Sequence, residues 1–288
     1  MIAEFVHTLR RLRGQIIGWS IGVALYGLFM ALLFDSITQI EGFEQLLASY
    51  PEEIMGFFGD IMSIMTPKGY LDVYYFAYMH VIVGILAISA AAGLIIGDEE
   101  KGTLDLVLAH PISRSRLFWG RVLGYVAALV IILLAGWLSW VIPAQGTTLD
   151  LTWLEFLRPF GPLLATLLLF GSLALVLSMV MPSARLAGML AGGLLVGNYL
   201  LVGLSNLNEN LANIVEYTPL YYYQGGDAVT GLNWGWLGGL IGVTLVLALI
   251  AWWRFQERDI RVGGEGGWKL PASLQRLARR RQSAGQQA

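Results

Sequence analysis

The sequence predicts an all-α integral membrane protein with six transmembrane helices, and three observations support this prediction. The 288 residues are 56% hydrophobic and 13% charged, whereas soluble domains average about 45–50% apolar and about 25% charged residues. Six apolar runs are each long enough to cross a hydrocarbon core of about 30 Å at about 1.5 Å per residue. Finally, Lys and Arg cluster in alternate connecting segments, as the positive-inside rule requires.

The N-terminal segment carries Arg10, Arg11 and Arg13 among apolar residues, which is typical of an amphipathic helix on a membrane face. A cleaved signal peptide is the alternative interpretation. However, the apolar run 15–34 is longer than the roughly 7–15 residues of a signal core, and no A-x-A site follows it. We therefore expect residues 1–14 to form a cytoplasmic interfacial helix, followed by the first span.

The six-span domain is predicted to cover residues 15–255. Its spans are expected at about 15–34, 74–97, 117–142, 160–181, 185–206 and 235–255. Met181 to Arg185 separate the fourth and fifth spans, so these two helices should form a tight hairpin. Because the number of spans is even, both termini should lie on the same side of the membrane.

Orientation follows from the basic residues. With the N-terminus inside, all 18 Lys and Arg residues except Lys68 and Arg158 fall in inner segments. This bias predicts that both termini and the loop 97–116 are cytoplasmic, in a multi-pass protein of the plasma membrane.

The remaining polar segments are predicted to lie at the membrane surfaces. The outer segments 35–73 and 207–234 combine acidic or aromatic residues with apolar ones, so we expect amphipathic helices at the outer surface. Residues 256–288 form a basic, Gly-containing tail, which we expect to be cytoplasmic and partly disordered.

The loop 97–116, which reads GDEEKGTLDLVLAHPISRSR, concentrates charge and helix-ending residues between two apolar runs. Gly102 permits a bend, and Thr103 can cap a short helix over residues 103–109. The apolar residues of this helix share one face: Leu104, Val107 and Leu108. A short helix outside the membrane needs lipid or a protein groove to cover such a face. His110-Pro111 should end this helix, and Ser113 can cap the next one.

Motifs of catalysis and metal binding are missing from the sequence. There is no cysteine, the three histidines are far apart, and no G-x-x-x-x-G-K-[ST], G-x-S-x-G or H-E-x-x-H occurs. We therefore predict that the chain is not an enzyme and binds no metal or cofactor itself.

Polar residues inside the predicted spans are few. His80 is interpreted as a packed or interfacial histidine rather than a proton relay. Asn198 is the deepest strongly polar residue, and we expect it to form an interhelical hydrogen bond or to line a substrate path. The fifth span also carries two tandem G-x-x-x-G pairs, which permit close helix contacts within the chain or across a dimer: Gly188, Gly192, Gly193 and Gly197.

The loop resembles the signature cytoplasmic loop of ABC-2-type permeases, the membrane subunits of ATP-binding-cassette exporters. The family pattern is E-x-G-T-x-[ED], followed by P-[VI]-S-R, between the second and third of six spans. The matching residues are Glu100, Gly102, Thr103, Asp105, Pro111, Ser113 and Arg114, with Leu108 where an apolar residue is expected. The resemblance covers about residues 1–262.

This resemblance implies that the loop is a coupling helix that docks into a separate ATPase subunit. In such a complex, two ATPase copies bind ATP and Mg²⁺, and a second permease copy or a related permease completes the path across the lipid bilayer. Leu104, Val107 and Leu108 would then insert into the ATPase. Rim contacts would come from Glu99, Glu100 and Arg114. No nucleic acid partner is expected.

A stand-alone ion-coupled carrier or channel is the alternative, which the scarcity of charge inside the spans disfavours. The same scarcity favours an amphipathic or hydrophobic cargo over a sugar polymer.

Overall fold

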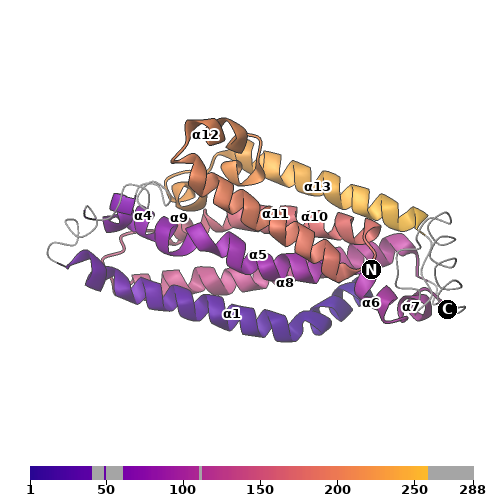
Figure 1. The fold of residues 1–288 in the computed structure, drawn as a ribbon. Helices are drawn as coiled ribbons and strands as arrows, with labels where there is room; N and C mark the ends of the chain where they lie inside the picture. The colour runs from indigo at the N-terminus through magenta and orange to yellow at the C-terminus, as the bar shows by residue number, and fades with distance from the viewer. Residues whose placement is uncertain (41–48, 50–60, 110–111, 259–288) are drawn as a thin grey trace, which may run out of the picture.

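The computed structural model describes residues 1–40, 49, 61–109 and 112–258. Within these ranges every regular element is helical, and six long apolar segments run side by side in one bundle (Figure 1). They are Ile2–Thr38, Pro67–Ala92, Arg114–Ala144, Trp153–Val180, Ala184–Ser205 and Trp234–Glu257. Each contains an 18-residue window whose mean hydropathy lies between 1.7 and 2.5. The prediction of six helices long and apolar enough to cross a membrane is therefore confirmed.

Several of these segments contain more than one helical element. The second consists of α4 (Pro67–Leu71), the π-helix η2 (Asp72–Phe76) and α5 (Ala77–Ala92), and the fourth consists of α9 (Trp153–Leu157) and α10 (Phe160–Val180). The others are α1 (Ile2–Thr38), α8 (Arg114–Ala144), α11 (Ala184–Ser205) and α13 (Trp234–Glu257). Short helices connect them: η1 (Ile61–Met65), α6 (Ile96–Glu100), α7 (Leu104–Leu108), α12 (Glu209–Val215), η3 (Pro219–Tyr222) and η4 (Gly225–Val229).

Side-chain caps determine where several helices begin. The Thr152 hydroxyl accepts a hydrogen bond from the Glu155 backbone N–H, and the Glu155 carboxylate accepts one from the Thr152 N–H, which forms a capping box on α9. Ser183 caps α11 directly after the end of α10, so the predicted hairpin between the fourth and fifth spans is confirmed. Asn233 caps α13 in the same way.

Helices α1 and α8 form the longest helix pair, and glycines on α8 set their close approach. A Cβ on Gly120 would lie 2.7 Å from the Cβ of Glu4, and a Cβ on Gly124 would lie 2.7 Å from that of Thr8. This G-x-x-x-G pair is therefore used within the chain. In the structure the predicted interfacial helix 1–14 and the first span belong to one continuous helix, whose N-terminal turns pack on α8.

Helix α10 occupies the middle of the bundle, where α5, α8, α11 and α13 surround it. Its buried residues come from all around its circumference, including Leu163, Ala165, Leu169 and Leu175. Such a uniformly apolar helix is typical of a position with no outward-facing side.

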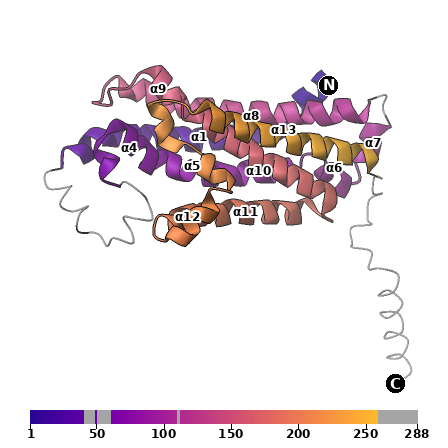
Figure 2. The same cartoon turned by 90° about the horizontal axis from the view of Figure 1, so that it is seen from above.

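The two ends of the bundle differ in composition. The N-terminus, α6, α7 and the end of α13 gather at one end, whereas α4, α9 and α12 lie at the other (Figure 1, Figure 2). Lys68 and Arg158 lie at the α4–α9 end, where they bind Asp227 and the Val229 carbonyl. The other described Lys and Arg residues lie toward the α6–α7 end, as the predicted grouping of inner segments requires.

The two segments predicted to lie outside are described to different extents. Residues 41–48 and 50–60 of the segment 35–73 lie outside the described residues, whereas 207–234 includes the short helices α12, η3 and η4. Asp72 connects η2 to η4, because its Oδ1 atom accepts a hydrogen bond of 2.6 Å from the Gly226 N–H. Glycine is required there, since a Cβ on Gly226 would lie 2.3 Å from the Asp72 Cβ.

Candidate functional site

The loop after the second span folds into two short helices, and we call residues 93–109 the elbow. Helix α5 ends at Ala92, earlier than the predicted limit of 97, and α6 (Ile96–Glu100) follows after a turn at Gly93. Gly102 then takes a φ of 66°, a left-handed conformation that favours glycine, and α7 (Leu104–Leu108) begins two residues later. Both short helices lie at the end of the bundle, next to the N-terminus (Figure 1).

The apolar face of α7 is turned toward the chain itself. Leu104 is 1% exposed and belongs to the core, and Val107 and Leu108 pack against the core half-buried. Leu106, in contrast, is 67% exposed. The face that the sequence predicts to insert into a partner is therefore partly covered by the chain itself, whereas Leu106 on the opposite side of α7 is exposed.

Of the two helix caps predicted in the loop, the one at Ser113 forms and the one at Thr103 does not. Thr103 holds the N-cap position of α7, yet its hydroxyl donates to the Asp98 carbonyl, and no side-chain cap forms. Ser113 does cap α8, because its Oγ atom accepts a hydrogen bond from the Arg116 N–H. Asp105 is exposed on α7. The predicted helix stop at His110 and Pro111 lies outside the described residues.

Asp98 connects the elbow to α1 and α8. Its two carboxylate oxygens accept from Arg11 at 3.0 Å and from Arg121 at 2.7 Å. Arg121 is 1% exposed, and its guanidinium also bonds Glu4 at 3.2 Å and the Leu94 carbonyl at 2.9 Å. A buried guanidinium is tolerated only when partners surround it in this way.

Glu99 and Glu100 connect the elbow to two further helices. Glu99 is buried and pairs with Arg258 at 3.3 Å, just beyond α13, and Arg258 also donates to the Ser178 and Met179 carbonyls of α10. Glu100 accepts a hydrogen bond of 2.8 Å from the Ala184 N–H, the first residue of α11. Glutamate at a helix N-terminus is also favoured by the helix dipole.

Arg114, the first residue of α8, binds the end of α13. Its guanidinium donates to the carbonyls of Phe255, Gln256 and Arg258, at 3.2, 2.9 and 2.8 Å. The Phe255 and Gln256 carbonyls belong to the last turn of α13, where carbonyl oxygens have no partner within the helix, and Arg258 follows directly. Three consecutive acids and one arginine thus join the elbow region to α1, α8, α11 and α13. They hold the elbow in place from inside the chain, and contacts of Glu99, Glu100 and Arg114 with a partner stay a prediction.

Comparison with known proteins identifies the family. The family model described as "ABC-2 family transporter protein" matches residues 20–260. This chain belongs to the ABC-2 transporter family.

One relative is named as a membrane protein and another as a probable ABC transporter permease. The ABC-2 chain is 26% identical to "Uncharacterized membrane protein YdbK" of Bacillus subtilis, over 67% of this chain and 83% of the relative. It is 30% identical to "Probable ABC transporter permease protein NosY" of Pseudomonas aeruginosa, over 34% of this chain and 36% of that protein. The ABC-2 chain is thus a membrane subunit of an ABC transporter.

The glycines of α11 in the ABC-2 chain fall into two groups. Gly188 and Gly192 face α5 and line a groove between the two helices. Gly193 and Gly197 face outward, and a Cβ at either position would meet nothing within 4 Å. Within the part of the chain that the structure describes, neither Gly193 nor Gly197 lies in close contact with another helix.

Asn198 and His80 of the ABC-2 chain are both buried in the half of the bundle toward α4, η3 and α12. The Oδ1 atom of Asn198 accepts a hydrogen bond of 3.0 Å from the Leu220 N–H, so its partner is the short helix η3. His80 packs between Tyr199 and Tyr223, with ring centroids 5.5 and 4.8 Å away. This environment is that of a packed histidine.

The sequence analysis did not identify Arg11, Arg121 and Arg258 as partners of the elbow. Their roles depend on contacts between segments that are far apart in the sequence. A signal was present for Arg121, which lies inside the predicted third span 117–142. An ionisable residue within a span is rare and usually has a buried partner. The exposure of Leu106 could have been predicted, because this residue lies outside the i, i+3, i+4 face of α7.

Proposed function

We propose that this ABC-2 chain is the permease subunit of an exporter and that a separate ATPase subunit binds the elbow and drives transport by ATP hydrolysis. The arrangement of the elbow carries this proposal. Its short helix α7 presents Leu106 away from the bundle, while Asp98, Glu99 and Glu100 connect it to four long helices. A partner that moves α7 would therefore move the ends of those helices as well.

The elbow and both termini face the cytoplasm in this proposal, and the protein lies in the plasma membrane. The distribution of basic residues supports this orientation, because Lys and Arg are retained on the cytoplasmic side during insertion. ATP is available on that side, where the ATPase subunit must bind.

The ATPase and the permease have different roles in this proposal. Two ATPase copies bind ATP and Mg²⁺, and this chain contributes no catalytic group. Its part is to transmit a displacement at α7 through the ion pairs of the elbow, of which Asp98–Arg121 and Glu99–Arg258 are largely buried. Water and salt screen these pairs less than exposed pairs, so the elbow is held more firmly to the helices.

Co-purification tests the proposal. The tagged chain is co-expressed with the ATPase whose reading frame adjoins this one and contains G-x-x-x-x-G-K-[ST]. We expect the ATPase to be captured from solubilised membranes and the reconstituted complex to hydrolyse ATP. An ATPase variant without the motif lysine should be captured equally but should not hydrolyse ATP. Failure of capture would contradict the proposal.

A second copy of this chain is proposed to pack against the outward face of α11. Gly193 and Gly197 lie on this face beside Leu190 and Leu194, which are exposed, so another helix could approach closely. Two facing permeases would enclose the path for the cargo.

Because the chain has no cysteine, single-cysteine variants test this contact cleanly. We expect Gly197→Cys to form a disulfide-linked dimer in oxidised membranes, since two Cα atoms must come within about 7 Å for a disulfide. Gly242→Cys on α13, which is equally open, is the matched control and should stay monomeric. Equal cross-linking of both variants, or of neither, would count against this face.

A further inference from the structure

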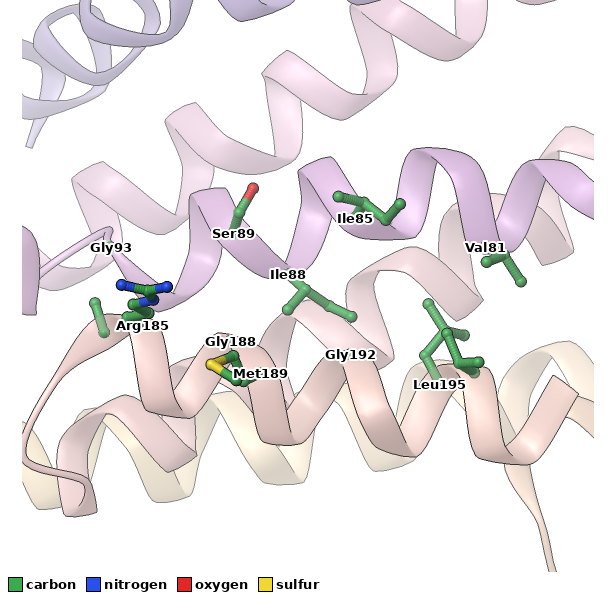
Figure 3. A pocket seen from close by; sticks show the side chains of 12 residues that line it. Val81, Ile85, Ile88, Ser89, Gly93, Arg185, Gly188, Met189, Gly192 and Leu195 are labelled. Carbon is green, nitrogen blue, oxygen red and sulfur yellow. The ribbon is translucent and has the colours of Figure 1, made fainter. Parts of the chain in front are cut away.

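A polar cavity lies beyond one end of the apolar groove between α5 and α11. Figure 3 shows that groove, with Val81 and Leu195 toward this end. Farther along the same two helices, toward the α4–α9 end of the bundle, is a cavity of about 200 Å³, which η3, η4 and the residues between them help to enclose. We call it the η4 cavity, and the polar and aromatic residues that line it include Asp72, His80, Tyr199, Tyr223, Gln224 and Asp227.

The charged groups of the η4 cavity are acidic. Asp72 and Asp227 line it, and none of the described residues that line it is Lys or Arg. Lys68 pairs with Asp227 at 2.6 Å and so offsets one of the two negative charges. The Asp72 carboxylate is held in place by the Gly226 N–H, which donates to its Oδ1 atom. The excess of negative charge favours a cation as the ligand of this cavity.

His80 offers a hydrogen-bond acceptor to the same cavity. It is 4% exposed, and its Nδ1 atom lies 3.2 Å from the Phe76 carbonyl of its own helix. Because a carbonyl can only accept, Nδ1 carries the proton and Nε2 is the acceptor. Nε2 lies on the ring edge away from that bond and has no hydrogen-bond partner among the described residues. A buried acceptor without a partner is costly, so a ligand that donates to Nε2 would be favoured.

Two tyrosine rings and a π-helix complete the wall around His80. The ring centroids of Tyr199 and Tyr223 lie 5.5 and 4.8 Å from that of His80, and aromatic rings attract cations through their faces. The Tyr223 hydroxyl donates to the Phe76 carbonyl at 3.0 Å, which fixes this wall to the π-helix η2. Asp72 is the first residue of η2. Single π-helical turns within longer helices occur frequently at functional sites.

The size and the opening of the η4 cavity limit its ligand to a small molecule. A cavity of about 150 Å³ is large enough for benzene, so about 200 Å³ accommodates roughly eight non-hydrogen atoms. Of the residues that line the cavity, Asn206 and Asp227 are exposed. A water-soluble ligand can therefore enter past these two polar side chains at the α4–α9 end.

The cavity is separate from the proposed contact between two copies of the chain. Helix α11 contributes Tyr199, Val202 and Asn206, which are three or four residues apart and share one face. With 3.6 residues per turn, this face lies across α11 from Gly193 and Gly197. A second copy on the glycine face therefore lies on the other side of the helix from the cavity.

We propose that the η4 cavity binds a small organic cation whose primary ammonium group donates to Asp72 and His80 while its apolar part packs against Tyr199 and Tyr223. A metal ion fits less well, because within the described part of the chain no group of three His, Asp or Glu side chains could hold one. A quaternary ammonium also fits less well, since only an N–H group can donate to His80 Nε2. The inference goes beyond the proposed function and is independent of ATPase coupling.

Binding of benzylammonium tests the proposal. The full-length chain is reconstituted in phosphatidylcholine nanodiscs, and saturation-transfer NMR measures binding of the probe, with empty nanodiscs as the background. We expect saturable binding to the unchanged chain. Asp72→Asn keeps the size of the side chain and an acceptor for the Gly226 N–H but removes the charge, so it should weaken binding at least about tenfold, or about 1.4 kcal/mol. His80→Phe keeps a ring but removes the acceptor, and it should weaken binding by a similar factor.

Matched probes and variants separate this site from nonspecific binding. Benzyl alcohol has the same size without the charge, so it should bind weakly and equally to the unchanged chain and to Asp72→Asn. Asp150→Asn removes an exposed carboxylate that does not line the cavity, and it should leave benzylammonium binding unchanged.

Three results would overturn the proposal. The first is equal binding of benzylammonium by the unchanged chain and by both Asp72→Asn and His80→Phe. The second is binding no greater than that of empty nanodiscs, which would leave the cavity to water. The third is displacement of the probe by an equal concentration of Na⁺, because the site would then select charge alone. Circular dichroism checks the fold of each variant, and His80→Phe, which leaves the Asp72–Gly226 contact in place, decides the outcome if Asp72→Asn does not fold.

Discussion

Replacing Arg121 with methionine is expected to lower the free energy of unfolding by about 3–5 kcal/mol, the cost typical of breaking a buried ion pair. Arg121 is almost fully buried and bonds Glu4, Asp98 and the Leu94 carbonyl. Without it, Glu4 has no other ion-pair partner among the described residues, although it remains buried. The measurement is the loss of helical circular dichroism of the detergent-solubilised chain as a denaturing detergent is added.

Arg11→Gln is the matched control for this experiment. Arg11 binds the same carboxylate at 3.0 Å, but its side chain is 31% exposed, so we expect a loss of at most about 1 kcal/mol. The double variant Arg121→Met with Glu4→Gln should recover part of the loss, because it removes the carboxylate left unpaired. A loss for Arg121→Met no larger than that for Arg11→Gln would show that the buried network does not stabilise this end of the bundle.

Replacing Leu106 with aspartate is expected to reduce capture of the ATPase by at least about thirtyfold while leaving the fold intact. Interface residues that insert into a partner typically contribute about 2 kcal/mol or more, and a charge at such a position also opposes burial. Within the described elbow, Leu106 is the only large apolar side chain that is exposed. The measurement is co-purification of the ATPase with the tagged chain at equal expression.

Leu104→Asp separates docking from folding. Because Leu104 is buried in the core, a carboxylate there should destabilise the bundle as well as reduce capture. Leu106→Met, which keeps an apolar side chain of similar size, should retain capture. If Leu106→Asp captures the ATPase as well as the unchanged chain does, α7 is not the docking helix in the form proposed.

The sequence alone was sufficient to predict the six long helices, the short helix in the second connection and the family. These features depend on local properties: the length and hydropathy of each run, the conformational freedom of Gly102, and capping residues such as Ser113 and Ser183. In a bilayer each helix satisfies its own backbone hydrogen bonds, so a single apolar run already determines a spanning element. The loop pattern from Glu100 to Arg114 likewise needs no tertiary contact to be recognised.

Only the tertiary structure decided which surfaces are covered. Helical spacing showed that Leu104, Val107 and Leu108 share a face, but periodicity cannot tell whether a partner or the chain itself covers that face. The same holds for glycine pairs, since Gly120 and Gly124 pack on α1 while Gly193 and Gly197 remain open. The acids of the elbow find partners as far as 87 and 159 residues away. Such pairs form because folding brings distant segments together in a medium of low polarity, where an unpaired charge is costly, and no local pattern in the sequence records them.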